Sequence, residues 1–146
     1  AASFSLASAF DWATGDPVID QPTTVQIRGM FGTNAVTAHF DLALFELGRV
    51  VLHGVVDTDE TDPADRMRLY LNGVLIPLRE FEDGTSPEQG AGFVLSAQDS
   101  IGLGNRAIGD RSPRGTLFYG AYYTRALSEQ QITHNALELL ASDDVR

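Results

Sequence analysis

Residues 57–62 read Asp-Thr-Asp-Glu-Thr-Asp and place four acidic side chains within six positions. Carboxylate oxygens are the hard ligands that calcium prefers, so Asp57, Asp59 and Asp62 are candidate metal ligands. The run lacks the mid-loop glycine and the closing bidentate glutamate of an EF-hand. Two interpretations therefore stay open, a calcium loop or an acidic turn that only keeps the surface hydrated.

The three histidines, His39, His53 and His134, are scattered along the chain. No His-x-His pair occurs and the chain has no cysteine, so a zinc site is not predicted. His53 lies in an apolar run and is expected to be a packed residue that donates one hydrogen bond. No Gly-x-Ser-x-Gly elbow is present, and no Ser-His-Asp arrangement follows from the spacing. No residue is therefore assigned a catalytic role.

A second polar stretch lies near residue 110 and carries four candidate ligand-binding side chains: Asn105, Arg106, Asp110 and Arg111. Amide, carboxylate and guanidinium groups are suited to recognising hydroxyl groups or a neighbouring protein. Ordinary surface loops have the same composition, so a loop without a ligand is the competing interpretation.

The net charge and the lengths of the apolar runs each argue against one class of partner. The chain has 20 acidic residues against 10 basic ones, a formal net charge of −10. A protein that follows nucleic-acid phosphates needs positive charge to release counterions, so nucleic acid is not an expected partner. No apolar run approaches the length that crosses a membrane, so no membrane segment is expected.

Short runs with a period of two predict an all-β chain that forms one domain over residues 1–146. The expected strands cover residues 4–12, 24–31, 36–44, 50–57, 66–71, 74–76, 93–95, 100–103 and 116–123. Residues 50–57 are apolar on both faces, which is typical of a central strand. Residues 80–92 are rich in glycine and polar side chains and are expected to form a long surface loop. The aromatic side chains of residues 118–123 are expected to pack mainly in the core.

Asn72-Gly73 separates two apolar runs and predicts a tight hairpin, because both central positions of such a turn need positive φ. Near the end of the chain, Ser128 and Gln131 form the pattern of a helix capping box. Leu127 and Ile132 are spaced to form a hydrophobic staple across that cap.

The expected helix has one apolar stripe, made of Ile132, Ala136, Leu139 and Leu140. Many short strands followed by a single helix predict a two-sheet antiparallel sandwich or a barrel.

Three stretches, with a fourth short one that fits between them, resemble the laminin-G-like, concanavalin A-like superfamily of jelly-roll domains, over residues 50–140. Residues 50–57 are similar to a strand that ends in aspartate before a variable loop. Residues 66–74, RMRLYLNGV, are similar to the family's "RLYVNGV" hairpin, and residues 101–105, IGLGN, to its "IGxGN" strand. Residues 114–128 are similar to the closing strand with its "YxRALS" run into a short helix.

The resemblance implies a concanavalin A-like jelly roll with one short C-terminal helix. Glucanases of this superfamily carry closely spaced carboxylates on one strand face, and the nearest approach here is Glu80-Phe81-Glu82-Asp83, beside a Gly/Pro-rich loop. A solvated loop is the preferred interpretation, so the chain is not expected to be an enzyme. Some laminin-G-like domains bind calcium at the sandwich rim, which is the family argument for the acidic run.

The stretch from residue 56 to residue 70 is similar to versions found in bacteriophage virion proteins. The expected function is therefore a non-enzymatic surface module, a capsid decoration or adhesion protein on the virion surface. The alternative is an extracellular carbohydrate-binding module of a larger secreted bacterial protein. No cofactor is expected apart from the calcium alternative.

The first 45 residues lie outside the resemblance and are short for the opening half of a jelly roll. Exposed sheet edges pair readily with other chains, so a homo-oligomer or a particle lattice is expected. The candidate contact residues alternate along the first predicted strand: Phe4, Leu6, Phe10 and Trp12.

Overall fold

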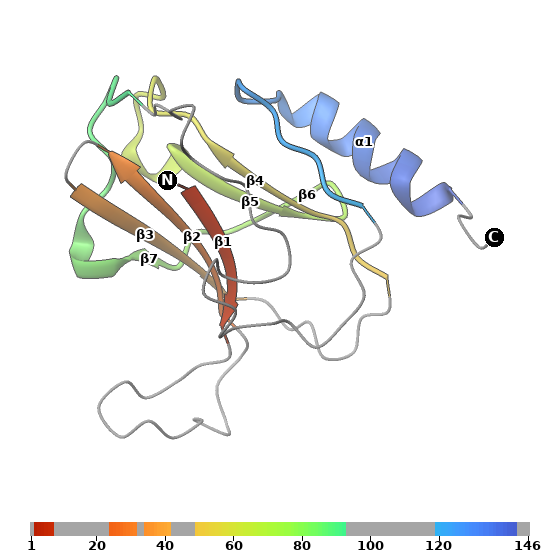
Figure 1. Ribbon diagram of the computed structural model, residues 1–146, viewed down its shortest axis with the longest axis horizontal. Helices are drawn as coiled ribbons and strands as arrows, with labels where there is room; N and C mark the ends of the chain where they lie inside the picture. Colours follow the sequence, from red (N-terminus) through yellow and green to blue (C-terminus); the bar gives the residue numbers. More distant parts are fainter. Residues whose placement is uncertain (1, 8–23, 32–33, 42–48, 93–118, 143–146) are drawn as a thin grey trace, which may run out of the picture.

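A computed structural model describes residues 2–7, 24–31, 34–41, 49–92 and 119–142 (Figure 1). These residues form two antiparallel sheets and one helix, α1 (Glu129–Ala141), at the C-terminal end. The all-β class with a single closing helix, predicted from the alternation of the sequence, is confirmed at this level.

The first sheet has the strand order β1-β2-β3-β7. Its strands are β1 (Ala2–Ala7), β2 (Thr24–Phe31), β3 (Asn34–Asp41) and β7 (Glu80–Phe81). The observed bounds of β2 are those that the alternation predicts. Val25, Ile27 and Phe31 are buried on one face of β2, while Arg28 and Met30 are exposed on the other.

The second sheet has the strand order β4-β5-β6. Its strands are β4 (Leu52–Val56), β5 (Met67–Leu71) and β6 (Val74–Ile76). Asn72 and Gly73 join β5 to β6 with φ of 53° and 85°, so the predicted two-residue hairpin is confirmed. Two short 3-10 helices, η1 (Pro63–Asp65) and η2 (Glu82–Gly84), complete the described elements.

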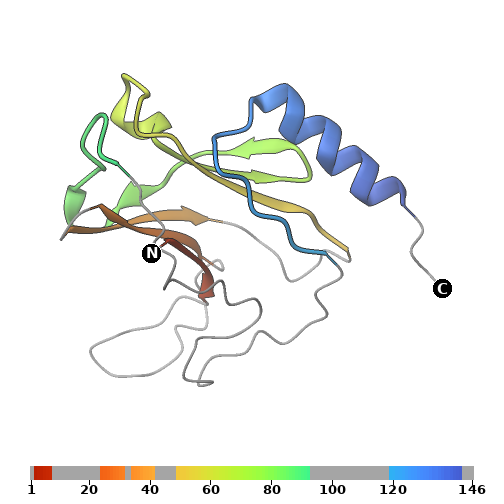
Figure 2. The same ribbon diagram turned by 45° about the horizontal axis from the view of Figure 1, so that its top comes forward.

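The two sheets face one another, and α1 covers the outer face of the second sheet (Figure 2). One apolar cluster fills the space between the sheets, where Ile27 and Phe40 of the first sheet join Met67 and Leu69 of the second. A second cluster joins Val55 and Tyr70 to Ile132 of the helix. The described chain is therefore built of three layers.

The helix begins as the sequence predicts. The Ser128 hydroxyl accepts a hydrogen bond from the Gln131 main-chain N–H, and the Gln131 side chain accepts one from the Ser128 N–H. Leu127 packs against the cluster that contains Ile132, which is the predicted hydrophobic staple. Both features fix the direction in which residues 119–128 approach the second sheet.

Replacing Ser128 with alanine is expected to lower the free energy of unfolding by about 1 kcal/mol, because the first helical turn loses an acceptor for its N–H groups. Chemical denaturation followed by circular dichroism measures the change. Ser128→Asp is the matched control, since a carboxylate caps the first turn equally well and its negative charge interacts favourably with the helix N-terminus. A loss as large for aspartate as for alanine would show that the cap does not hold the helix.

One prediction about the elements needs correction, and one stays a prediction. Residues 80–92 are not wholly a loop, because Glu80 and Phe81 form β7 and pair with β3. In the described part of the second sheet β5 lies between β4 and β6, and β5 is the described neighbour of β4, so the central position of residues 50–57 stays a prediction. The strand β4 is apolar on both faces because a layer lies above and below it: Val56 packs toward the first sheet and Val55 toward α1.

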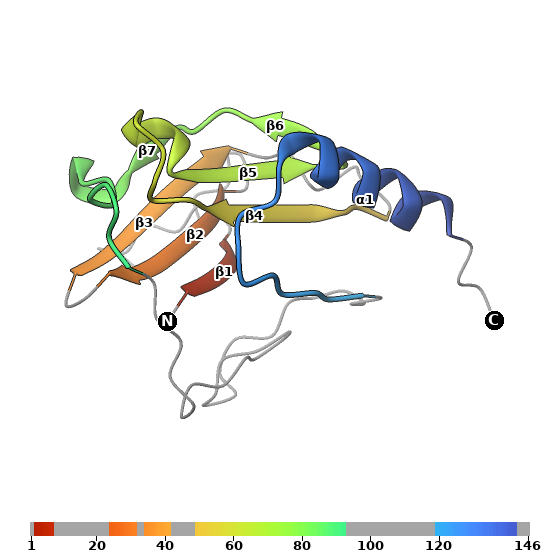
Figure 3. The same ribbon diagram turned by 90° about the horizontal axis from the view of Figure 1, so that it is seen from above.

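The apolar stripe of α1 is only partly buried. Ile132 and Ala136 are fully buried, whereas Leu139 and Leu140 are half-buried. The helix extends past the end of the second sheet, so its last turns have less sheet beneath them (Figure 3). The predicted strands at residues 93–95 and 100–103, and the continuations beyond Ala7 and Asp41, lie outside the described residues.

Candidate functional site

The acidic run of residues 57–62 forms part of the rim that leads from β4 to β5, and two of its three candidate carboxylates have local partners. Asp57 lies 3.7 Å from an Arg68 nitrogen and accepts a hydrogen bond from the main chain of Asp59. Asp62 accepts a 2.9 Å hydrogen bond from the main-chain N–H of Ala64 and so caps η1. The Asp59 side chain is exposed.

Within the ranges that the structure describes, no group of three or more histidine, aspartate or glutamate side chains is arranged to hold a metal ion. Asp57, Asp59 and Asp62 all fall within those ranges. Their oxygens serve a turn, an ion pair and the hydrated surface, and calcium binding stays a prediction.

Arg66 holds this rim together and was not identified as important from the sequence. It is 7% exposed, and its guanidinium donates to three main-chain carbonyl oxygens. The acceptors are Glu60 at 2.8 Å, Thr61 at 3.1 Å and Pro87 at 2.8 Å. A buried charge is tolerated when its hydrogen-bonding capacity is met, and three carbonyl dipoles meet most of it here.

Further contacts join the same two loops, residues 57–66 and residues 85–91. The Gly90 N–H donates to the Thr58 carbonyl at 2.9 Å, and the Thr58 hydroxyl donates to the Ala91 carbonyl at 3.0 Å. Gln89 donates from its side chain to the Asp59 carbonyl at 3.4 Å. The rim is therefore a pair of cross-linked loops that can present side chains in a fixed arrangement.

Exposed tyrosines lie on the segment that leads into α1. Tyr119, Tyr122 and Tyr123 are 57%, 49% and 45% exposed, and residues 119–123 are not in a strand. The prediction that this part of the chain is a strand with its aromatic side chains in the core is therefore wrong for residues 119–123.

The pattern misled because aromatic residues occupy positions of both parities, so it does not specify a buried face. A buried tyrosine also needs a partner for its hydroxyl. At Tyr123 the hydroxyl accepts a hydrogen bond from the Asn135 side chain at 3.4 Å, at the surface of α1. Residues 126 and 127 anchor the segment by packing against the Ile132 cluster.

His53 faces the helix side of β4, opposite Tyr70. Its Nδ1 is buried and has no hydrogen-bond partner among the described residues, so the prediction of a packed histidine that donates one hydrogen bond receives no support at this atom. Burial lowers the pKa of His53 below its ordinary value of 6.5, because the charged imidazolium loses hydration.

The lowered pKa of His53 predicts a dependence of stability on pH. Between the folded-state pKa and 6.5 the unfolded chain binds a proton that the folded chain does not, so stability rises with pH across that window. The contribution is fully present above pH 6.5 and is lost as the pH falls through the folded-state value. The unfolding free energy should therefore change less between the low and the high end of this pH range in His53→Leu than in the wild type. An unchanged difference in His53→Leu, or an equal reduction in His134→Gln, would contradict this assignment.

The remaining candidate residues either lie outside the described residues or are placed only by the register of their strand. Asn105, Arg106, Asp110 and Arg111 lie outside the described residues, as do Phe10 and Trp12. The register of β1 places Phe4 opposite Ile27 and Leu6 opposite Val25, two core positions of β2. Within the described first sheet, β1 is an edge strand.

The acidic stretch after residue 79 is exposed. Glu80 lies on β7, and its carboxylate is 3.4 Å from the Arg79 Nε. Glu82 and Asp83 follow in η2, where Asp83 adopts a positive φ of 58°.

No protein-family model, curated protein or solved structure matches this chain. Among the described residues, no helix is both long enough and apolar enough to cross a membrane.

Proposed function

We propose that this chain is a non-enzymatic surface module that acts by protein–protein contact on the exterior of a virus particle. The observation that carries the proposal is the group of exposed tyrosines at residues 119, 122 and 123. Tyrosine supplies a large contact area with few rotatable bonds, and it is enriched in protein interfaces. The segment is anchored at its C-terminal end, so binding would require little additional ordering.

The frame behind this segment also supports a binding role. The capping box and the packing of Leu127 fix the start of α1, and the Arg66 contacts fix the rim formed by residues 57–66 and 85–91. Binding loops on a rigid scaffold lose less entropy on association than mobile ones. We propose that the sheets belong to a concanavalin A-like jelly roll, which the resemblance over residues 50–140 supports.

A carbohydrate-binding module is the second candidate, and the same tyrosines favour it. The face of an aromatic ring is a suitable surface for the apolar face of a sugar, and the hydroxyl can form a hydrogen bond at its edge. Asn105, Arg106, Asp110 and Arg111 would supply polar contacts in that case.

Assembly through the edge of the first sheet is part of the proposal. The strand β1 has β2 on one side in the described sheet, and an edge strand can pair with another chain. Phe4, Leu6, Phe10 and Trp12 would lie near that contact in a homo-oligomer or particle lattice. Deleting residues 1–12 should then reduce the mass of the homo-oligomer measured by light scattering. A full chain that stays monomeric at high concentration and does not attach to particles would contradict it.

Mass spectrometry of purified particles tests the location. The chain should be present in particles of the virus whose genome carries the gene, and brief protease treatment of intact particles should remove it. Its absence from the particles, combined with specific binding on a glycan array, would favour the carbohydrate-binding module.

A further inference from the structure

A pocket opens where the β5–β6 hairpin ends. The last register pair is Leu69 opposite Ile76, and Pro77 then follows without an N–H that could continue the ladder. The chain turns away to join the first sheet as β7. The gap that remains beside the start of β5 is a cavity of about 250 Å³.

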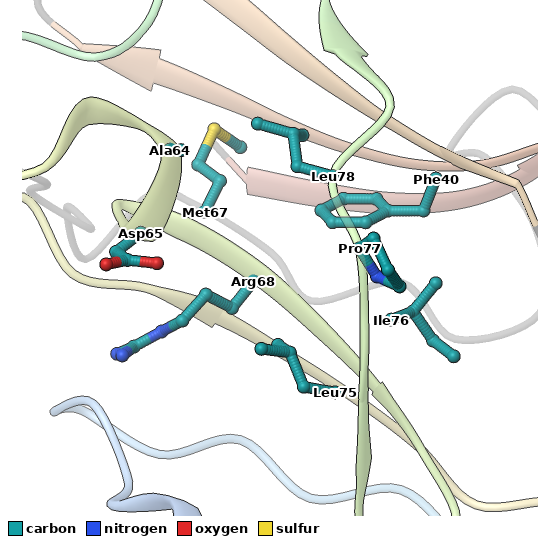
Figure 4. A pocket seen from close by; sticks show the side chains of 9 residues that line it. All are labelled: Phe40, Ala64, Asp65, Met67, Arg68, Leu75, Ile76, Pro77 and Leu78. Carbon is teal, nitrogen blue, oxygen red and sulfur yellow. The ribbon is translucent and has the colours of Figure 1, made fainter.

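Apolar side chains form most of the pocket wall (Figure 4). Phe40 and Met67, both fully buried, lie at its inner end, and Ile76 and Leu78 come from the departing strand. An apolar cavity of about 150 Å³ can hold benzene. The volume here is therefore sufficient for one apolar side chain and is small for a drug-sized ligand.

Counted together with the two acidic partners of Arg68, which lie beside the pocket, the charged groups at this site are net negative. Arg68 lines the pocket, but its charge is shared by Glu60 at 3.1 Å and Asp57 at 3.7 Å. Asp65 also lines the pocket, is exposed, and forms no ion pair with the described residues. Asp65 is thus an available carboxylate next to an apolar cavity.

We propose that this pocket binds an apolar side chain of a partner protein that has a lysine or arginine beside it. The apolar side chain fills the cavity and the neighbouring cation pairs with Asp65. Charge complementarity selects this partner, because both the rim and the whole chain, at −10, are negative. The site is distinct from the tyrosines and stands independently of the proposed function.

Methionine methyl NMR tests the proposal, because the chain has only two methionines. Met67 lies in the pocket wall, whereas Met30 is exposed on the outer face of the first sheet and serves as an internal control. The probe is the dipeptide N-acetyl-Leu-Lys-amide, compared with N-acetyl-Leu-Glu-amide and N-acetyl-Ser-Lys-amide.

The expected result is a saturable shift of the Met67 methyl signal with no shift at Met30. The glutamate dipeptide should bind at least about threefold more weakly than the lysine dipeptide, as expected for loss of an exposed ion pair. The serine dipeptide should bind at least about tenfold more weakly, because it leaves the cavity unfilled. No saturable shift at Met67 up to the solubility limit of the lysine dipeptide would overturn the proposal.

Three variants distinguish binding in the cavity beside Asp65 from non-specific attraction to the acidic surface. Asp65→Asn should abolish the preference for lysine over glutamate, while Asp59→Asn, in the same acidic loop, should leave it unchanged. Ala64→Leu should fill the pocket from its exposed rim and abolish binding. Equal effects of Asp65→Asn and Asp59→Asn would contradict a role for Asp65. Loss of dipeptide binding in these variants without loss of particle attachment would leave the proposed function intact.

Discussion

Replacing Gly73 with valine is expected to lower the free energy of unfolding by about 3 kcal/mol, the sum of backbone strain and overpacking. Gly73 has a φ of +85°, a conformation closed to β-branched residues. A Cβ there would also lie 3.0 Å from the Thr133 Cα and 3.4 Å from the Ala136 Cβ. The substitution therefore strains the hairpin and pushes against α1 at the same time.

Gly84→Val is the matched control for Gly73→Val. Gly84 also has a positive φ, 66°, but a Cβ there would meet nothing within 4 Å. Its cost should be about 1 kcal/mol, from backbone strain alone. Urea denaturation of both variants measures the difference. Equal losses would show that α1 does not pack on the hairpin in solution.

Replacing Arg66 with methionine is expected to lower the free energy of unfolding by about 3–5 kcal/mol. Methionine keeps much of the apolar volume but leaves the carbonyl oxygens of Glu60, Thr61 and Pro87 without the donors they have now. Because these acceptors belong to two loops, the loops at residues 57–66 and 85–91 should loosen together. Hydrogen exchange at the Gly90 amide, which bonds to Thr58, should rise in the variant.

Arg79→Met provides the comparison for the Arg66 variant. Arg79 also pairs with acidic groups, Asp41 at 3.2 Å and Glu80 at 3.4 Å, but its side chain is 42% exposed. Exposed ion pairs contribute about 1 kcal/mol at most, so this variant should stay close to the wild type. A loss for Arg66→Met as small as for Arg79→Met would show that the buried guanidinium does not hold the rim.

Features that depend on a few neighbouring residues were predictable from the sequence. The Asn72-Gly73 turn and the Ser128 capping box are both local, since each is set by backbone conformation within four residues. The strand β2 was equally clear because its buried and exposed side chains alternate without interruption.

Features that depend on the third dimension were not predictable. The acceptors of Arg66 come from residues 5, 6 and 21 positions away, and nothing in the local sequence distinguishes it from the less buried Arg68. The apolar pattern of β4 does not specify its place within the sheet, because burial on both faces depends on the layers above and below a strand and not on its neighbours in the sheet.

The pocket is a similar case. It requires that Pro77 end the β5–β6 ladder and that the chain then cross to the first sheet, and only the first of these events is visible in the sequence. The same holds for the tyrosines, whose exposure follows from the path of the segment before α1.

Attachment of tyrosine variants to purified particles tests the central claim most directly. A chain with Tyr119, Tyr122 and Tyr123 all changed to serine should keep the wild-type melting temperature, because all three side chains are exposed. Its retention on sedimented particles should fall at least about tenfold, as expected when a group of interface anchors is removed. A Val74→Ser, Leu137→Ser double variant removes exposed apolar side chains elsewhere and should attach like the wild type. Wild-type attachment of the folded tyrosine variant would contradict the claim that these tyrosines form the binding surface.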